Sequence, residues 1–193
     1  ITSDGIEETL IQAPELFRNA WFNQVVINDK EIHTSGALYG FEYDGPGTIS
    51  VSFVPVRPGD YTFNAPGYEN MTGTFHVTGN SLTTGATPLE LNIDTAKLTF
   101  SQTEFELETG KAYRLNVTSD GLEELGVMMP ELLQNSWLNQ LVIDDLEVKL
   151  NGAFSSIEYD DEGTISISFV PIRPGNYPFY APGYEEAGLK GMF

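Results

Sequence analysis

The chain repeats itself once along its length. Residues 2–69 align without a gap to residues 118–185, an offset of 116 residues, and 40 of the 68 aligned positions are identical. A period of this length is far above the roughly 20–50 residues of solenoid repeats, so the repeating unit is a whole domain. The sequence therefore predicts two tandem domains that share one fold.

The domain boundaries follow from the composition between the two copies. We expect a first domain at residues 1–78, a linker at residues 79–93 and a second domain at residues 94–193. The stretch 79–88 is small, polar and uncharged, which is typical of a linker. With 40% hydrophobic residues in 193, the chain has enough apolar side chains for two hydrophobic cores.

The residue pattern within each domain indicates β-structure. Ile49, Val51 and Phe53 alternate with serines, and the same alternation returns at residues 165–169. A period of two places the apolar side chains on one face of a half-buried strand. Further strands of the second domain are expected at residues 98–100, 105–107 and 113–117.

One short helix is expected in each domain. Pro14 and Pro130 each precede a Glu-Leu pair, and proline suits the first position of a helix because that position needs no N–H donor. An apolar stripe follows each proline and includes Trp21 and Trp137. The predicted fold class is all-β: two tandem Greek-key β-sandwiches, each with a short helical insertion.

The charge and the missing residue types exclude several classes of function. The chain has 28 acidic and 9 basic residues, and a net charge of −19 repels phosphate, so nucleic-acid binding is not expected. No apolar stretch approaches the roughly 20 residues of a transmembrane helix. The chain has no cysteine and two histidines, which excludes thiolate chemistry and leaves little for acid–base catalysis. We therefore expect no enzyme.

The second domain ends in a motif that suggests a family. Residues 177–184 are Tyr-Pro-Phe-Tyr-Ala-Pro-Gly-Tyr, followed by Gly-Leu-Lys-Gly at residues 188–191. This resembles the cupredoxins, whose copper-binding members have Tyr-x-Phe-x-Cys-Pro-Gly-His and then Gly-Met-x-Gly. The resemblance covers residues 96–193 well and residues 1–78 nearly as well. It implies that each domain is a cupredoxin-like Greek-key sandwich.

The same resemblance shows which residues stand at the copper-ligand positions. A blue-copper site needs a thiolate, two imidazoles and usually a weak thioether. The corresponding positions hold Thr9, Ala65, Tyr68 and Met71 in the first domain, and Leu125, Ala181, Tyr184 and Leu189 in the second. Because the strong ligands are replaced in both domains, we expect no copper and no other cofactor. We also expect each former site to be filled, by Tyr68 with Met71 and by Tyr184 with Leu189.

Other metal and catalytic interpretations are weaker. His33 and His76 have no histidine counterparts in the second domain. The acidic hairpin 158–162 contains Glu158, Asp160, Asp161 and Glu162, and either a solvated turn or a calcium site remains open there. The carboxylate pairs at residues 7–8 and 123–124 are chain neighbours, whereas a glycosidase needs two opposed carboxylates.

The leading functional hypothesis is a non-catalytic, copper-free module that acts by protein–protein contact. The family resemblance suggests an extrinsic subunit, periplasmic or otherwise extracytoplasmic, on a membrane-bound respiratory or photosynthetic reaction-centre complex. Its acidity would suit a basic partner, such as a cytochrome, with Tyr68 and Tyr184 as candidate contacts. The alternative is a free-standing extracytoplasmic binding module, either carbohydrate-binding or adhesive.

The two copies differ at their ends. The first domain has no counterpart of residues 97–117, and the second stops before the counterpart of residues 76–78. We expect both ends to lie inside a domain, with the N-terminal strands of the first domain and the end of the closing strand of the second missing. Either an upstream segment or a strand lent by a partner would then complete the first sandwich.

Overall fold

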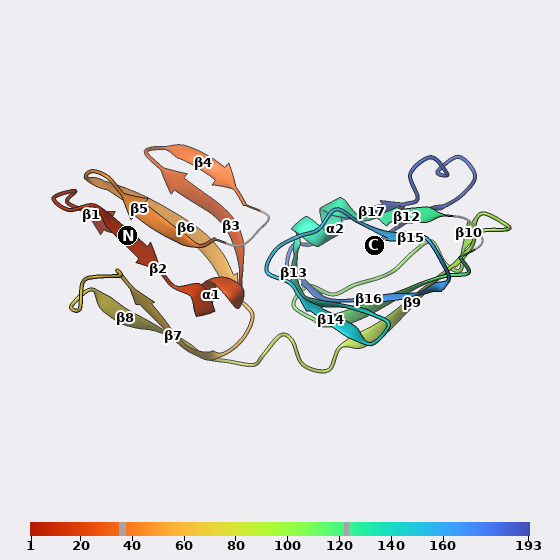
Figure 1. Ribbon diagram of the computed structural model, residues 1–193, viewed down its shortest axis with the longest axis horizontal. Helices are drawn as coiled ribbons and strands as arrows, with labels where there is room; N and C mark the ends of the chain where they lie inside the picture. Colours follow the sequence, from red (N-terminus) through yellow and green to blue (C-terminus); the bar gives the residue numbers. More distant parts are fainter. Residues whose placement is uncertain (35–37, 122–123) are drawn as a thin grey trace. The chain divides into compact units, whose positions relative to one another are not determined.

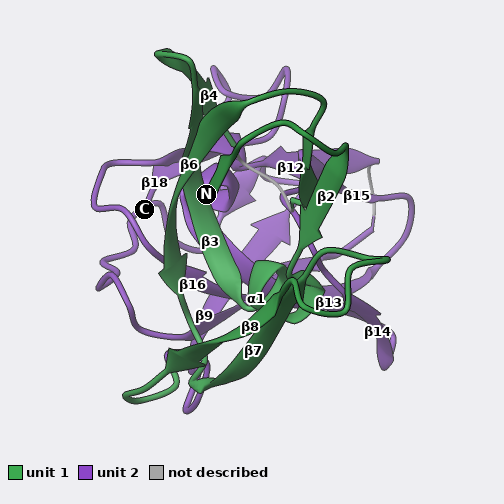
Figure 2. Ribbon diagram, turned by 90° about the vertical axis from the view of Figure 1, so that its left-hand side faces the viewer, with its two compact units in different colours: residues 1–81 green, residues 82–193 purple. Residues whose placement is uncertain are grey.

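A computed structural model describes residues 1–34, 38–121 and 124–193. The chain divides into two compact units, unit 1 at residues 1–81 and unit 2 at residues 82–193, which are coloured separately in Figure 2. Strands dominate both units, and the described part of each unit contains a single five-residue helix (Figure 1). The expected all-β fold with one short helical insertion per domain is confirmed.

The described residues of unit 2 form two sheets. A six-stranded sheet has the order β10-β9-β11-β16-β13-β14, and a four-stranded sheet has the order β15-β12-β17-β18. The strands of the first sheet are β9 (Thr87–Asp94), β10 (Thr99–Phe100), β11 (Tyr113–Ser119), β13 (Ser136–Ile143), β14 (Leu146–Lys149) and β16 (Gly163–Pro171). Those of the second are β12 (Leu125–Met128), β15 (Ser156–Tyr159), β17 (Pro178–Tyr180) and β18 (Lys190–Met192).

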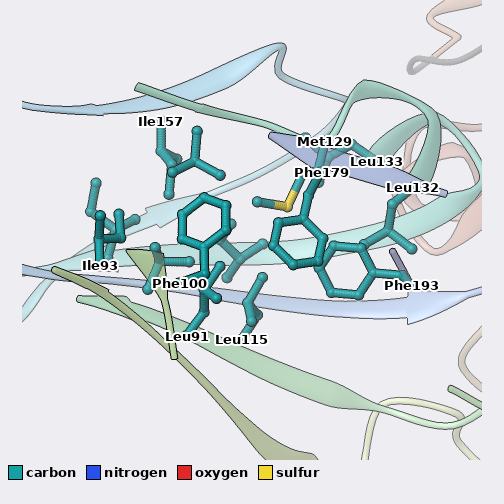
Figure 3. Close-up of a cluster of buried hydrophobic side chains, with 14 of the residues drawn as sticks. Leu91, Ile93, Phe100, Leu115, Met129, Leu132, Leu133, Ile157, Phe179 and Phe193 are labelled. Carbon is teal, nitrogen blue, oxygen red and sulfur yellow. The ribbon is translucent and has the colours of Figure 1, made fainter. Parts of the chain in front are cut away.

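The core of unit 2 lies between these two sheets. Alternate residues of β11 and β16 point inward, and Leu115, Val117 and Ile167 are completely buried. Phe179 of the second sheet packs against Phe100 at a ring-centroid distance of 5.4 Å and against Phe193 at 4.9 Å (Figure 3). The alternation in the sequence therefore corresponds to one apolar face per strand.

A short helix joins the two sheets of each unit. In unit 2, α2 (Pro130–Gln134) connects β12 to β13, and its Leu132 and Leu133 are buried in the core. The helix begins at the proline, as expected, and ends where the Asn135 side chain donates to the Glu131 carbonyl at 2.8 Å. The equivalent helix of unit 1, α1 (Pro14–Arg18), ends on Asn19 in the same way.

Unit 1 repeats this arrangement with fewer strands. Its sheets have the orders β1-β6-β3-β4 and β5-β2-β7-β8. The strands of the first sheet are β1 (Thr2–Ser3), β3 (Ala20–Ile27), β4 (Lys30–His33) and β6 (Gly47–Pro55). Those of the second are β2 (Thr9–Gln12), β5 (Gly40–Tyr43), β7 (Gly59–Asn64) and β8 (Thr72–Val77).

The described residues of unit 1 include no counterpart of β9 or β10. In addition, β1 offers two residues where β11 offers seven. The core of unit 1 is less completely covered: Phe75 is 39% exposed, whereas the corresponding Phe193 is 7% exposed and stacks on Phe105 at a ring-centroid distance of 5.1 Å.

Two expectations about unit 2 differ from the structure. The expected linker 79–93 is shorter, because β9 already begins at Thr87 and the division between the units falls after Ser81. Leu91 and Ile93 are buried and belong to the core of unit 2. The expected strand at residues 105–107 does not form: the Phe105 N–H donates to the Met192 carbonyl, but no strand ladder follows.

Candidate functional site

The loop that the resemblance aligns with the copper-ligand loop of cupredoxins has a defined fold in unit 1. It runs from Ala65 to Met71 between β7 and β8. The Ala65 N–H donates to the Met71 carbonyl at 2.9 Å, which closes the loop at its base. Inside it, the Tyr68 N–H donates to the Ala65 carbonyl at 3.1 Å, and the Met71 N–H donates to the Tyr68 carbonyl at 3.0 Å. Backbone bonds therefore hold the three ligand positions close together.

Unit 2 folds the equivalent loop in the same way. The Ala181 N–H donates to the Leu189 carbonyl at 3.0 Å, and the Tyr184 N–H donates to the Ala181 carbonyl at 3.0 Å. The tight turn needs a left-handed residue, and Gly183 supplies it with φ of +85°, as Gly67 does in unit 1 with φ of +90°. The two loops thus share one backbone fold.

The fourth position lies beside this loop in unit 1. Thr9 begins β2, and together with Tyr68 and Met71 it lines a hollow of about 560 Å³. The apolar side chains of Ile6 and Tyr43 also line this hollow. The structure therefore brings together three of the four positions that the sequence marked in unit 1, while Ala65 is buried at the base of the loop.

The side chains at these positions do not fit copper. The Thr9 hydroxyl is engaged with the Glu7 carbonyl at 3.0 Å, and the Tyr68 hydroxyl makes a long bond of 3.4 Å to the Glu8 carbonyl. Among the four positions of unit 1 this leaves Met71 as a soft donor, and a single thioether is the weakest member of a blue-copper set. In unit 2 three of the four positions carry only alkyl groups.

The expectation that side chains fill both former sites holds in one unit only. In unit 2, Leu189 is 0% exposed and packs in the core, together with Leu125 and Ala181. In unit 1, Met71 is 49% exposed and Tyr68 is 37% exposed, so the expectation was wrong there. Tyr68 and Met71 line the hollow beside the loop of unit 1 without closing it, so the hollow remains open to solvent.

A second feature lies next to Thr9 in unit 1 and next to Leu125 in unit 2: each unit has a cluster of three carboxylates. The clusters are Glu8, Glu42 and Asp44 in unit 1, and Glu124, Glu158 and Asp160 in unit 2, with the ligand oxygens of each within 4.8 Å of one another. All six residues are exposed, and the two sets are related by the repeat offset of 116 residues. We call them the acidic clusters.

Strand pairing assembles these clusters. Thr9 of β2 lies opposite Tyr43 of β5, and both side chains are buried. Glu8 is next to Thr9, and Glu42 and Asp44 flank Tyr43. Because neighbouring residues of a strand point to opposite faces of the sheet, these three carboxylates share the solvent side. In unit 2 Leu125 lies opposite Tyr159, and the same alternation applies.

The proximity of like charges has an electrostatic consequence in unit 1. A side-chain hydrogen bond with Glu8, followed by the charge of Asp44, raises the pKa of the Glu42 carboxyl above its ordinary value. Carboxylate oxygens are ligands for hard cations such as Ca²⁺, which takes six to eight of them. Each acidic cluster supplies three carboxylates, which is part of such a set.

Sequence reasoning missed these clusters. It placed the calcium alternative on the hairpin 158–162, whereas the structure joins Glu158 and Asp160 to Glu124 instead. Asp161 accepts a hydrogen bond from the backbone of Glu162, within the turn. The available signal was the return of all three carboxylates at the same offset, with two of them spaced two residues apart, one in a strand and one directly after it. Glu123 lies outside the described residues.

The two histidines lie apart from both features. His76 of β8 faces Asp60 of β7, with 2.7 Å between Nδ1 and the carboxylate, and both side chains are exposed. His33, at the end of β4, is 3.7 Å from the Glu31 carboxylate. Their surroundings are those of surface histidines paired with a neighbouring carboxylate.

The difference between the two former copper sites predicts a difference in stability. Leu189→Ala should lower the free energy of unfolding of unit 2 by about 2–5 kcal/mol, because it leaves a cavity in a packed core. Met71→Ala, the matched change in unit 1, should stay within about 0.5 kcal/mol because the side chain is half exposed. Denaturant titration of the full chain, followed by NMR signals assigned to each unit, measures both. Equal losses would contradict the asymmetry.

The raised pKa of Glu42 predicts a pH dependence. A carboxyl whose pKa is higher in the folded than in the unfolded state contributes stability below its ordinary pKa of 4.5, and this is lost as the pH rises through the folded value. Glu42→Gln removes the repulsion, so it should raise Tm at pH 7 more than at pH 4. Glu69→Gln, an exposed glutamate outside the clusters, controls for the loss of one charge. Equal shifts for both variants would refute the coupling.

Comparisons with known proteins return structures alone. No described protein family matches the sequence, and no curated protein sequence matches it. A multicopper oxidase from Campylobacter jejuni is 9% identical, with a TM-score of 0.38, over 96% of this chain and 50% of that chain. A McoA multicopper oxidase variant from Aquifex aeolicus is 10% identical, with a TM-score of 0.46, over 90% of this chain and 52% of that chain.

A smaller copper protein matches one part of the chain. An auracyanin from Roseiflexus castenholzii is 19% identical, with a TM-score of 0.35, and the match covers 56% of this chain and 96% of that chain. This chain spans about half the length of those two multicopper oxidases. The resemblance of both units to cupredoxins rests on the chain itself: the strand order of two packed sheets and the two folded Pro-Gly loops.

Proposed function

We propose that this chain is a non-catalytic, copper-free module that works through protein–protein contact. The observation that carries the proposal is the pair of loops at residues 65–71 and 181–189. Both keep the hydrogen-bonded backbone of a copper-ligand loop, but neither presents a thiolate or an imidazole. A loop that retains its shape without its ligands is suited to presenting a surface.

In unit 1 that surface is exposed and apolar. Tyr68, Met71 and Ile6 stand around the hollow with 37%, 49% and 79% of their surface exposed, respectively. Exposed aromatic and thioether side chains grouped at one place are typical of protein interfaces. We therefore assign the partner contact to the Tyr68 loop, whereas Tyr184 of unit 2 packs against the core.

The charge indicates the kind of partner. A net charge of −19 favours association with a basic surface and makes that association sensitive to salt. We propose an extracytoplasmic setting, with the chain as an extrinsic subunit on a membrane-bound electron-transfer complex. None of the helices that the structure describes is long and apolar enough to cross a membrane.

The absence of copper binding is tested by titration. After exposure to Cu(II) or Cu(I) and dialysis, mass spectrometry should find well under one copper per unit. A variant with Leu125→His, Ala181→Cys, Tyr184→His and Leu189→Met restores the expected ligand set on the same backbone and serves as a positive control. Retention of about one copper per unit by the unchanged chain would overturn the copper-free assignment.

The partner contact is tested with a basic c-type cytochrome as the probe. Binding, measured by isothermal titration calorimetry, should weaken as NaCl is raised and should weaken about tenfold in Tyr68→Ser, the loss expected for a central aromatic contact. Tyr39→Ser changes another exposed tyrosine and should have no effect. If Tyr68→Ser binds as the unchanged chain does, the assigned surface is wrong. Binding to a glycan array instead of the cytochrome would favour a carbohydrate-binding module.

A further inference from the structure

A groove in unit 1 borders the Tyr68 loop and is distinct from the hollow beside Met71. Its volume is about 730 Å³, and it is lined by the start of α1, the outward-facing residues of β7 and the loop itself. The helix α1 contacts β7 in this unit (Figure 1). Tyr68 lines both the groove and the hollow. We call it the β7 groove, and its lining includes Glu15, Asp60, Asn64, Tyr68 and Glu69.

The lining of the β7 groove is rich in hydrogen-bond acceptors and in negative charge. Glu15 of α1, Asp60 of β7 and Glu69 of the loop bring carboxylates from three different elements. Thr62 and Asn64 of β7 add a hydroxyl and an amide oxygen. The described residues that line the groove include no lysine or arginine. Because an ionised carboxylate accepts hydrogen bonds and donates none, the groove suits a cation that carries several donors.

The three carboxylates are not drawn together as in a metal site. Among the described residues, the groups of three carboxylates whose oxygens lie within 4.8 Å of one another are the two acidic clusters. Glu15, Asp60 and Glu69 form no such group, so their oxygens are spread more widely. A calcium ion draws its oxygen ligands to about 2.3–2.6 Å. The wider spacing therefore favours a larger, planar cation.

Tyr68 gives the groove an aromatic surface. The residue keeps 37% of its surface exposed, and Glu69 follows it in the same loop. A guanidinium group is planar, so it stacks on an aromatic ring while its fork of N–H groups bonds to carboxylates. An ammonium group is a compact, strongly hydrated charge without such a plane. A tyrosine beside carboxylates therefore matches an arginine side chain better than a lysine side chain.

The carboxylate of Asp60 is held in place by the neighbouring strand. Nδ1 of His76 on β8 lies 2.7 Å from Oδ1 of Asp60, and the Asp60 side chain still keeps 73% of its surface exposed. A group that is already positioned loses less conformational freedom when a ligand binds. The groove thus offers one oriented carboxylate that a ligand can reach.

Unit 2 has the same elements with different chemistry. The inward-facing Tyr61 and Phe63 of β7 return unchanged through the repeat, and so do Tyr68 and Glu69 of the loop. The outward-facing positions change: Asn176, Pro178 and Tyr180 replace Asp60, Thr62 and Asn64, and Lys190 stands at the strand-pair position of Thr72. Because the inward side is the same in both units, packing of the core does not require the acidic outward residues. The acidic groove is therefore a property of unit 1.

Charge complementarity separates the candidate occupants. A second copy of this chain would bring a net charge of −19 to a groove lined by carboxylates, which opposes self-association there. A neutral sugar would leave the carboxylates without a counter-charge. A guanidinium supplies both the charge and the donors that the lining lacks.

We propose that the β7 groove binds an arginine side chain of the protein partner, with the guanidinium on the Tyr68 ring and its N–H groups directed at the carboxylates of the groove. This rests on the proposed function and deepens it, because it names the chemical group that the Tyr68 loop recognises. The hollow on the other side of Tyr68 then contacts the apolar surroundings of that arginine.

The first test is a ¹⁵N NMR titration of the full chain with N-acetyl-arginine methylamide. We expect saturable shifts at the amides of Thr62, Gly67 and Thr72, and none at their counterparts in residues 176–190. The citrulline compound has the same shape without the charge, and it should bind about tenfold more weakly. The lysine compound has the charge without the planar fork, and it should also bind more weakly. These measurements leave the protein unchanged, so the folding of a variant is not in question.

The second test transfers two residues of unit 2 into unit 1. Asp60→Asn with Thr72→Lys should weaken binding of the arginine compound about tenfold and weaken cytochrome binding in calorimetry by a similar factor, because it removes one carboxylate and adds a positive charge. Unit 2 folds with these residues at the equivalent positions. Glu106→Gln with Thr109→Lys makes the same change in net charge at exposed positions of unit 2 and serves as the control.

Three results would overturn the proposal. The first is equal binding of the citrulline or lysine compound, and the second is an equal loss of binding in the control variant. The third is a shift of the groove amides with protein concentration alone, which would make a second copy the occupant. Cytochrome binding that depends on Tyr68 but not on Asp60 and Thr72 would reject the arginine site and leave the proposed function standing. Specific binding of the arginine compound without any binding of the cytochrome would support the site and reject the proposed partner.

Discussion

Seven consecutive residues of β11 pair with β16, and this antiparallel ladder determines how completely a unit of this protein can bury its core. Through this ladder β11 joins the sheet at the edge of β16, and β9 pairs in parallel with the other side of β11. Phe169 of β16 is buried beside Tyr113 of β11, and Phe193 is buried against Phe105 and Phe179. Where only the two residues of β1 remain, the equivalent phenylalanines of unit 1 keep part of their surface in water. Two units that share 40 of 68 aligned residues thus differ in how completely they bury equivalent side chains.

The Pro-Gly loop is insensitive to this difference. In both units its shape depends on local backbone hydrogen bonds and on one left-handed glycine, which do not depend on the neighbouring strands. The side chains at equivalent positions of the loop differ in burial between the two units. Leu189 is completely buried in the core of unit 2, whereas Met71 and Tyr68 are exposed at the surface of unit 1. The same loop is therefore a core element in unit 2 and an exposed surface in unit 1.

The sequence was sufficient wherever the determinant was local or repeated. The alternation at residues 49–53 predicted β6, and Pro14 and Pro130 predicted the starts of both helices. It was insufficient where distant segments meet. The acidic clusters depend on the register of β2 with β5 and of β12 with β15, which no single stretch displays. The strand β9 was assigned to the linker because its polar flank concealed the alternation of Leu89, Leu91 and Ile93.

The two edges of the first sheet of unit 1 are chemically different. The outer edge, β4, carries Lys30, Glu31 and His33 within four residues, and charges on an edge strand oppose pairing with other chains. The opposite edge, along residues 49–55 of β6, has no charged residue and alternates apolar side chains with serines. An edge that is to remain unpaired gains from charges, while an edge that is to be paired must lack them, because each charge would have to lose water on pairing. The composition of β6 is that of an interior strand, like its counterpart β16, which has a neighbour on each side.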